Sequence, residues 1–266
     1  MDNKRIANIA NTQIVRWRLV ITLYLACLLS GAANAGLPET IIKVKPSIVA
    51  VGTVQKTRRP PVKFYGTGFV VGDGNHVVTN AHVVPAVLDV AGMETLTVLV
   101  GGGQSANARK AEQVAMDLQH DLVILKIDGP PLPALELGDS NLVMAGELYA
   151  FTGFPLGTVL GFYPVTHRGL ISNISPIVLP AQSSRQLTVE MIRRLNAPFN
   201  IFQLDATAYP GNSGSPVYNP ENGRVVAILN MVFVKETKET IIEKPSGIAY
   251  AIPINYVKAL LETIKQ

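Results

Sequence analysis

The sequence predicts an all-β fold built in two halves, and three observations carry that prediction. The apolar runs are short, rich in valine and isoleucine, and separated by Gly, Pro, Asn or Asp, as expected for short strands joined by turns. The two halves contain similar numbers of such runs and are joined by a proline-rich segment, "PPLPALELGDS". With 48% hydrophobic and 16% charged residues, the 266-residue chain can bury a core and is not disordered in composition.

The strand-like runs can be placed in order on either side of that linker. In the first half the runs are residues 47–54, 66–80, 95–100 and 121–127. Residues 66–80 hold two strand-like runs joined by Gly-Asp-Gly-Asn, which predicts a hairpin. The second half begins near Asn141, and its runs are residues 147–155, 163–172, 202–208, 215–219, 223–234 and 247–253.

Two segments are expected to be helical. The last one, "NYVKALLETIKQ", has apolar residues at i, i+3, i+4 and i+7, with Asn255 as a possible N-cap. An insertion at residues 174–200 interrupts the second half, and within it Val189, Ile192 and Leu195 are spaced three apart. A short helix in the insertion is therefore possible.

The first 35 residues have the layout of a secretory signal. Four basic residues precede the uncharged stretch "LVITLYLACLL", and "SGAANA" then ends in small residues at Ala33 and Ala35. We expect cleavage before Gly36 and a protein exported to a bacterial periplasm or secreted. An uncleaved membrane anchor facing the periplasm is the alternative, although the apolar stretch is shorter than the ~20 residues that a spanning helix needs.

Removal of this segment changes the cysteine count and the net charge. The single cysteine, Cys27, lies within it, so the mature chain would have no disulfide framework, thiol nucleophile or cysteine-based metal site. Of 23 basic and 19 acidic residues, four and one lie there, which leaves 19 and 18 and a net charge of +1. This balance gives no reason to expect a nucleic-acid partner.

One short stretch near the end of the chain, "YPGNSGSP" (209–216), places a serine between glycines. Pro, Gly, Asn and Ser are turn residues, so an ordinary turn is one interpretation. The other is that the backbone is bent to present Ser213 as a nucleophile. That interpretation requires a histidine to take the serine's proton and a carboxylate to orient the histidine.

Both partners can be found in the first half. His82 lies in "VVTNAHVV", where a strand ends and its ring can face a cleft. Asp121 opens the most apolar strand, and a buried acidic residue needs a partner. Asp117 and Asp128 are expected to be solvated, and His120, although adjacent to Asp121, is expected to point to the opposite face of a strand.

The order His82, Asp121, Ser213, with five motifs around it, resembles the chymotrypsin-fold serine proteases of the HtrA (Deg) group. "GTGFVV…HVVTNAHVV" resembles that family's histidine block, "HDLVILKI" its aspartate block and "QLDATAYPGNSGSPVYN" its serine block. "LELGDSNLVMAGE" is similar to the segment that enters its second barrel, and "GIAYAIPINYVKALLE" to its closing strand and helix. The likeness covers about residues 40–265.

The resemblance implies two six-stranded antiparallel β-barrels and a short C-terminal helix. The first barrel would span about 45–135, the second about 141–252 and the helix about 255–265, all within a protease domain of residues 36–266. The backbone N–H groups of Gly211 and Ser213 would form the oxyanion hole. No metal or cofactor is required by this mechanism, and the partner would be a protein or peptide substrate. A homo-oligomer is possible, and contact with a membrane is expected only if the N-terminal segment is uncleaved.

The chain also departs from the family's pattern. Ser215 stands where HtrA proteases usually carry a second glycine, and "GNSGSPV" is instead found in glutamyl endopeptidases of the same fold. The chain ends after the closing helix, so the PDZ domain usual in the family is expected to be absent. The insertion at 174–200 would occupy the position of a regulatory loop, with a passive surface excursion as the alternative.

Substrate preference is expected to be for small or medium apolar residues at P1, the residue before the scissile bond. Trypsin-like specificity would need a carboxylate at Thr207, and Asp205 lies two residues too early. The strand after the nucleophile lacks the histidine of glutamyl endopeptidases, so His167 is the one residue that could alter this preference. The predicted pocket residues are Ala208, Leu229, Asn230 and Met231.

The sequence thus predicts a serine endopeptidase that cleaves exported or unfolded proteins through an acyl-enzyme. Two other functions remain open on the same fold. One is a catalytically silent binding module, and the other is a chaperone-like protein in which proteolysis is secondary.

Overall fold

The computed structural model describes residue 17 and residues 36–103, 106–157, 161–177, 198–230 and 247–264. Three features of the sequence prediction lie outside these residues: the signal segment with its cleavage site, the possible helix of the insertion, and Met231.

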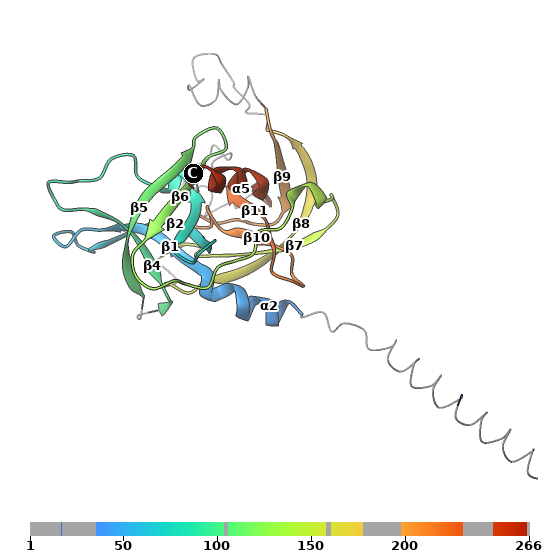
Figure 1. Cartoon of the computed structure of the whole chain (residues 1–266), viewed down its shortest axis with the longest axis horizontal. Helices are drawn as coiled ribbons and strands as arrows, with labels where there is room; N and C mark the ends of the chain where they lie inside the picture. Colours follow the sequence, from blue (N-terminus) through green and yellow to red (C-terminus); the bar gives the residue numbers. More distant parts are fainter. Residues whose placement is uncertain are drawn as a thin grey trace, which may run out of the picture. The chain divides into compact units, whose positions relative to one another are not determined.

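The described residues form two closed antiparallel β-barrels of six strands each (Figure 1). The first barrel closes in the order β1-β2-β3-β6-β5-β4, and its strands are β1 (Ile48–Val54), β2 (Val62–Val71), β3 (His76–Asn80), β4 (Thr95–Val100), β5 (Asn107–Asp117) and β6 (Leu122–Ile127). The second closes as β10-β11-β12-β9-β8-β7, with β7 (Leu148–Gly153), β8 (Val165–Pro176), β9 (Asn200–Asp205), β10 (Pro216–Tyr218), β11 (Val225–Asn230) and β12 (Ile248–Pro253). The predicted fold class is confirmed.

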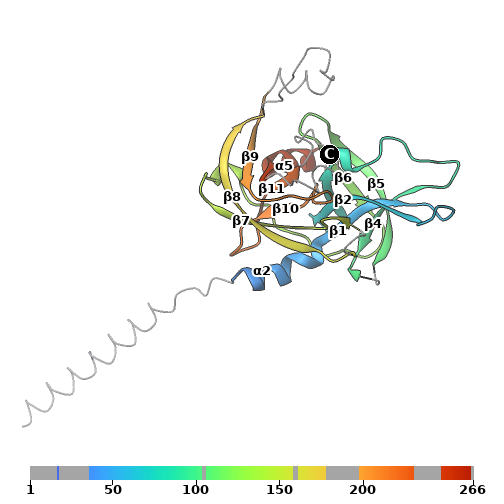
Figure 2. The same ribbon diagram turned by 180° about the vertical axis from the view of Figure 1, so that it is seen from behind.

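Two helices accompany the barrels. The helix α5 (Ile254–Glu262) follows β12 directly and contacts β5, β6, β11 and β12, so it touches both barrels. Figures 1 and 2, which view the chain from opposite sides, both show it beside β11. The helix α2 (Leu37–Val44) precedes β1 and is followed by a 3₁₀ turn, η1 (Lys45–Ser47).

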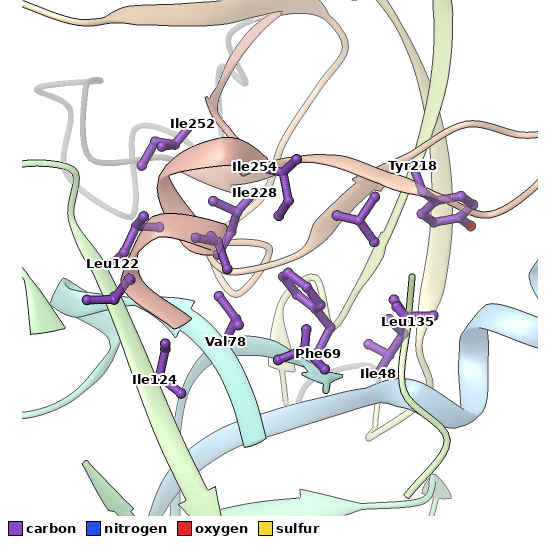
Figure 3. Packing of buried hydrophobic residues seen from close by; sticks show 14 of the residues in the cluster. Ile48, Phe69, Val78, Leu122, Ile124, Leu135, Tyr218, Ile228, Ile252 and Ile254 are labelled. Atoms are coloured by element: carbon purple, nitrogen blue, oxygen red, sulfur yellow. The ribbon is translucent and has the colours of Figure 1, made fainter. Parts of the chain in front are cut away.

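Three clusters of buried side chains make up the core. One fills the first barrel and one fills the second. The third lies between the barrels and under α5, and its members include Ile48, Phe69, Val78, Leu122, Ile124, Leu135, Tyr218, Ile228, Ile252 and Ile254 (Figure 3). Strand β6 shows why its sequence is almost entirely apolar. Leu122 and Ile124 point into the third cluster, whereas Val123 and Leu125 point into the barrel, so both faces of the strand are buried.

The structure differs from the sequence prediction at three elements. Strand β5 was not predicted, because most of its side chains face solvent and its sequence, "NARKAEQVAMD", lacks an apolar alternation. Helix α2 was also missed. The final helix begins one residue earlier than predicted, at Ile254, and Asn255 does not cap it; its amide donates to Asp139 instead (2.9 Å).

The third cluster is expected to contribute strongly to stability because it joins the two barrels. Ile228→Ala should lower the free energy of unfolding by about 2–5 kcal/mol, through lost burial and the cavity left behind. Urea denaturation measures this change. The control is Leu142→Ala at a side chain that is 75% exposed, where the expected change is within about 0.5 kcal/mol. Equal effects of the two substitutions would contradict the assignment of this core.

Candidate active site

The turn that carries Ser213 depends on two glycines with left-handed backbone conformations. Gly211 has φ +99° and Gly214 has φ +87°, a region that residues with side chains disfavour. A Cβ at Gly214 would also collide with the backbone oxygen of Thr67, and a Cβ at Gly211 with that of Phe154. The turn therefore packs directly against backbone from two other segments, which limits where Ser213 can lie.

The backbone N–H groups of this turn divide into bonded and unbonded donors. Those of Asn212, Gly214 and Ser215 donate to backbone oxygens within or beside the turn at 2.9–3.0 Å. Those of Gly211 and Ser213 donate to no group in the described part of the chain. The two predicted oxyanion donors are thus the two that remain available to a developing negative charge.

Thr67, on β2 of the first barrel, connects that barrel to the Ser213 turn of the second. Its N–H donates to the oxygen of Ser213 (2.8 Å), and its hydroxyl donates to the oxygen of Gly211 (2.7 Å). The same hydroxyl accepts from the N–H of Phe154 (3.0 Å), and the Thr67 oxygen accepts from the Thr79 hydroxyl (2.6 Å). The N–H and the hydroxyl of Thr67 therefore form the joint between the barrels, while its carbonyl is bonded within the first barrel.

His82 and Asp121 form a two-point hydrogen-bonded pair. The ring Nδ1 of His82 lies 2.6 Å from Oδ2 of Asp121, and the backbone N–H of His82 donates to Oδ1 (2.9 Å). The Asp121 side chain is 8% exposed and that of His82 is 31% exposed. An ionised carboxylate only accepts hydrogen bonds, so the imidazole proton lies on Nδ1 and Nε2 is left as the acceptor.

A third donor reaches the same carboxylate from the second barrel. The side-chain amide of Asn230, at the end of β11, donates to Oδ2 of Asp121 at 2.7 Å. The backbone oxygen of Asp121 accepts from the Ala81 N–H (3.0 Å) and the Asn80 amide (3.2 Å). These contacts fix both the carboxylate and the backbone that carries it, as a buried charge requires.

Ser213 lies close to the histidine segment. A Cβ at Gly66 would touch both the Val83 side chain and the backbone oxygen of Ser213, so one glycine separates the two segments. No hydrogen bond joins the Ser213 hydroxyl to the His82 ring among the described residues. The His–Asp half of the predicted triad is therefore bonded in the structure, and the Ser–His half is not.

The predicted pocket residues occupy different environments. Leu229 is fully buried in the core cluster of the second barrel, and Ala208 belongs to the same cluster at 6% exposure. The prediction that the Leu229 side chain lines a substrate pocket is therefore wrong, because alternation along β11 turns it into the barrel. Asn230 points at Asp121, so its side chain is engaged there instead.

His167 lies on β8 opposite Phe151, on whose ring it stacks at 5.1 Å between centroids. Its ring centroid is 6.3 Å from that of Tyr209, four residues before Ser213. Burial lowers the pKa of His167, and its Nε2 is buried without a hydrogen bond in the described residues. Burial therefore favours the neutral form of this ring.

Sequence reasoning missed the roles of Thr67 and Asn230. The signal for Asn230 was a polar residue at the end of the otherwise apolar run "VVAIL", which implies a buried partner. Thr67 offered no comparable signal, because threonine is common in strands.

The described residues contain no group of three or more side chains suited to hold a metal ion. Nor does any helix among them have the length and apolar character needed to cross a bilayer.

The segment from β2 to β11 matches a known family model. Residues 66–228 match the model described as a trypsin-like peptidase domain. The chain belongs to the trypsin-like peptidase family. The matched range contains His82, Asp121 and Ser213, and the predicted resemblance to serine proteases of this family is confirmed.

Curated relatives of this trypsin-like peptidase chain carry the name "probable periplasmic serine endoprotease DegP-like". The protein from Halomonas elongata is 31% identical over 200 residues, covering 75% of this chain and 35% of its own length. That from Hahella chejuensis is 25% identical over 286 residues, covering 94% and 54%. The predicted likeness to the HtrA (Deg) group is confirmed, and the chain spans about a third to a half of the length of these relatives.

Solved structures agree on the fold. The HtrA-type protease AlgW with a tripeptide superposes with a TM-score of 0.60 at 23% identity, covering 86% of this chain and 63% of that one. The same protease with a decapeptide gives 0.60 at 23% identity, covering 87% and 67%.

The joint at Thr67 is expected to control both stability and activity. Thr67→Val keeps the side-chain shape but leaves the Gly211 oxygen and the Phe154 N–H without their partner, which should cost about 1–3 kcal/mol of unfolding free energy. Urea denaturation and a peptidase assay measure the two effects. Thr95→Val removes an exposed hydroxyl contact and is the control. Full activity and stability in Thr67→Val would contradict the role assigned to the joint.

Proposed function

We propose that this chain is a serine endopeptidase that acts through His82, Asp121 and Ser213. The observation that carries the proposal is the 2.6 Å contact between His82 Nδ1 and Asp121 Oδ2, which leaves Nε2 as a base on the side away from the carboxylate. The glycine-rich turn supports it independently, because two of its N–H groups bond to nothing within the described residues. The names of the DegP-like relatives agree with this activity.

In the first half of the reaction, Ser213 Oγ attacks the carbonyl carbon of the scissile peptide bond, and His82 Nε2 takes the hydroxyl proton. The carbonyl oxygen becomes an oxyanion and accepts hydrogen bonds from the N–H groups of Gly211 and Ser213. Asp121 stabilises the imidazolium and holds its orientation. His82 then gives the proton to the leaving amine, and the acyl-enzyme remains.

In the second half, water takes the place of the amine. His82 removes a proton from the water, which attacks the acyl carbon, and the ester bond to Ser213 breaks as the proton returns to Oγ. The unbonded Ser213–His82 pair in the free protein is compatible with this cycle, because catalytic hydrogen bonds are often long without substrate and tighten when it binds.

The proposed substrates are exported or unfolded proteins in the periplasm, cleaved after small or medium apolar residues. The periplasmic names of the relatives and the predicted signal segment support the location. Asp205 is exposed and Thr207 is uncharged, so the described residues offer no carboxylate for a basic P1 side chain at that position. An unpaired charge in such a pocket would lose its hydration without compensation.

The catalytic assignment has a direct test. Ser213→Ala should abolish peptide-bond cleavage, and His82→Ala should lower kcat by roughly four to six orders of magnitude, because these residues act as a unit. Hydrolysis of a denatured protein measures this loss, with Ser172→Ala, an exposed serine on β8, as the control. Reaction of wild type with a fluorophosphonate separates the proposal from a silent binding module, since labelling requires an activated serine.

The P1 preference is tested by a peptide library varied at that position only. We expect kcat/KM to be highest for small or medium apolar residues. Thr207→Asp should shift relative kcat/KM toward Lys and Arg by roughly tenfold or more, the scale of a single pocket contact. Best cleavage after Glu, Lys or Arg by the wild-type protein would show that the pocket is misassigned.

A further inference from the structure

The backbone of Asp121 has a conformation that must be held by its surroundings. Its φ is +55°, which is uncommon for a residue other than glycine and persists where neighbouring contacts determine it. Asp121 ends the turn that connects β5 to β6. The contacts of the preceding residue, His120, therefore bear on the direction of the Asp121 carboxylate.

His120 forms its own two-point pair with Asp117, which contradicts the prediction that Asp117 is solvated. Its ring Nδ1 lies 2.5 Å from Oδ2 of Asp117, and its N–H donates to Oδ1 (3.1 Å). The two residues meet because His120 lies in a turn and not in a strand. Burial raises the pKa of Asp117, but the hydrogen bonds from His120 outweigh it and the pKa is lowered. The arrangement repeats that of His82 and Asp121.

Two aromatic rings pack against the His120 ring. It stacks on Tyr256 of α5 with a centroid separation of 3.9 Å and an interplanar angle of 18°. The ring of Phe199, which precedes β9, meets it edge-on at 4.5 Å. Phe199 and Tyr256 also contact each other at 5.4 Å, and the His120 side chain is 14% exposed.

These contacts connect the turn of one barrel to two elements of the other half of the chain. The turn belongs to the first barrel, while Phe199 leads into the second barrel and Tyr256 lies on α5, which follows β12. A planar histidine that is stacked on one face and bonded at Nδ1 has few orientations open to it. Contacts from its own turn and from the other half of the chain therefore hold the backbone of His120, which leads directly into Asp121.

We propose that His120 is a positioning residue that holds the turn carrying Asp121, through its bond to Asp117 and its stack on Tyr256. The expected effect on catalysis rests on the proposed function, whereas the expected effect on the His82–Asp121 hydrogen bond does not. Loss of the stack should loosen the His82–Asp121 hydrogen bond even in the free protein. A misplacement of the order of 1 Å at a catalytic group can cost about 10²-fold in rate.

The test compares three substitutions on α5. Tyr256→Leu removes the stack, Tyr256→Phe keeps it, and Val257→Ala removes buried contacts from the adjacent residue without touching His120. The structural readout is solvent exchange of the His82 Nδ1 proton by NMR, assigned with ¹⁵N-histidine labelling and by its absence in His82→Gln. The catalytic readout is the rate of reaction with a fluorophosphonate.

We expect the Nδ1 proton of His82 to exchange roughly tenfold faster or more in Tyr256→Leu, with a loss of fluorophosphonate reactivity of about 10- to 100-fold. Tyr256→Phe should match wild type, and Val257→Ala should lose stability without faster exchange. Unchanged exchange in a folded Tyr256→Leu, or equal acceleration in Val257→Ala, would overturn the positioning role.

Asp117→Asn provides a second variant that leaves all three rings in place. It weakens the bond to His120, so exchange of the His82 Nδ1 proton should again accelerate, and unchanged exchange here would also count against the proposal. If wild type does not react with the fluorophosphonate, the proposed function fails, whereas the exchange measurements still decide the role of His120.

Discussion

The hydrogen bonds of Thr67 are the constraint on which the arrangement of the site depends. The N–H and the hydroxyl of Thr67 tie a strand of the first barrel to the turn around Ser213 in the second, and its carbonyl is held within the first barrel by Thr79. Gly214 brings the turn directly against this strand, because a Cβ there would collide with the backbone oxygen of Thr67. The position of Ser213 therefore depends on the docking of the two barrels.

The same dependence holds for the carboxylate. Asp121 belongs to the first barrel, yet it accepts hydrogen bonds from His82 of that barrel and from Asn230 of the second. A nearly buried carboxylate is costly without such donors, so correct docking compensates its loss of water. The apolar cluster between the barrels supplies the driving force for docking, and the polar contacts determine its geometry.

Much of the fold could be predicted because short patterns in the sequence indicate its turns, strands and helices. The hairpin of β2 and β3 follows from its glycine turn, and α5 from its apolar spacing. Strand β5 could not be found this way, since only Ala111 among its side chains is fully buried and pairing with β4 and β6 determines its conformation. The triad candidates were named from motifs, whereas the contacts of Asp121 with Asn230 and of His120 with Phe199 join segments more than 70 residues apart.

Strand β11 shows how one element can serve the core and the site together. Its side chains alternate, so Ala227 and Leu229 enter the second barrel while Ile228 and Asn230 face the first. Side chains on one face of β11 pack in the core of the second barrel. Those on the other face pack between the two barrels or bond to Asp121. All six side chains of β11 are therefore buried, and the strand supports the site through Asn230.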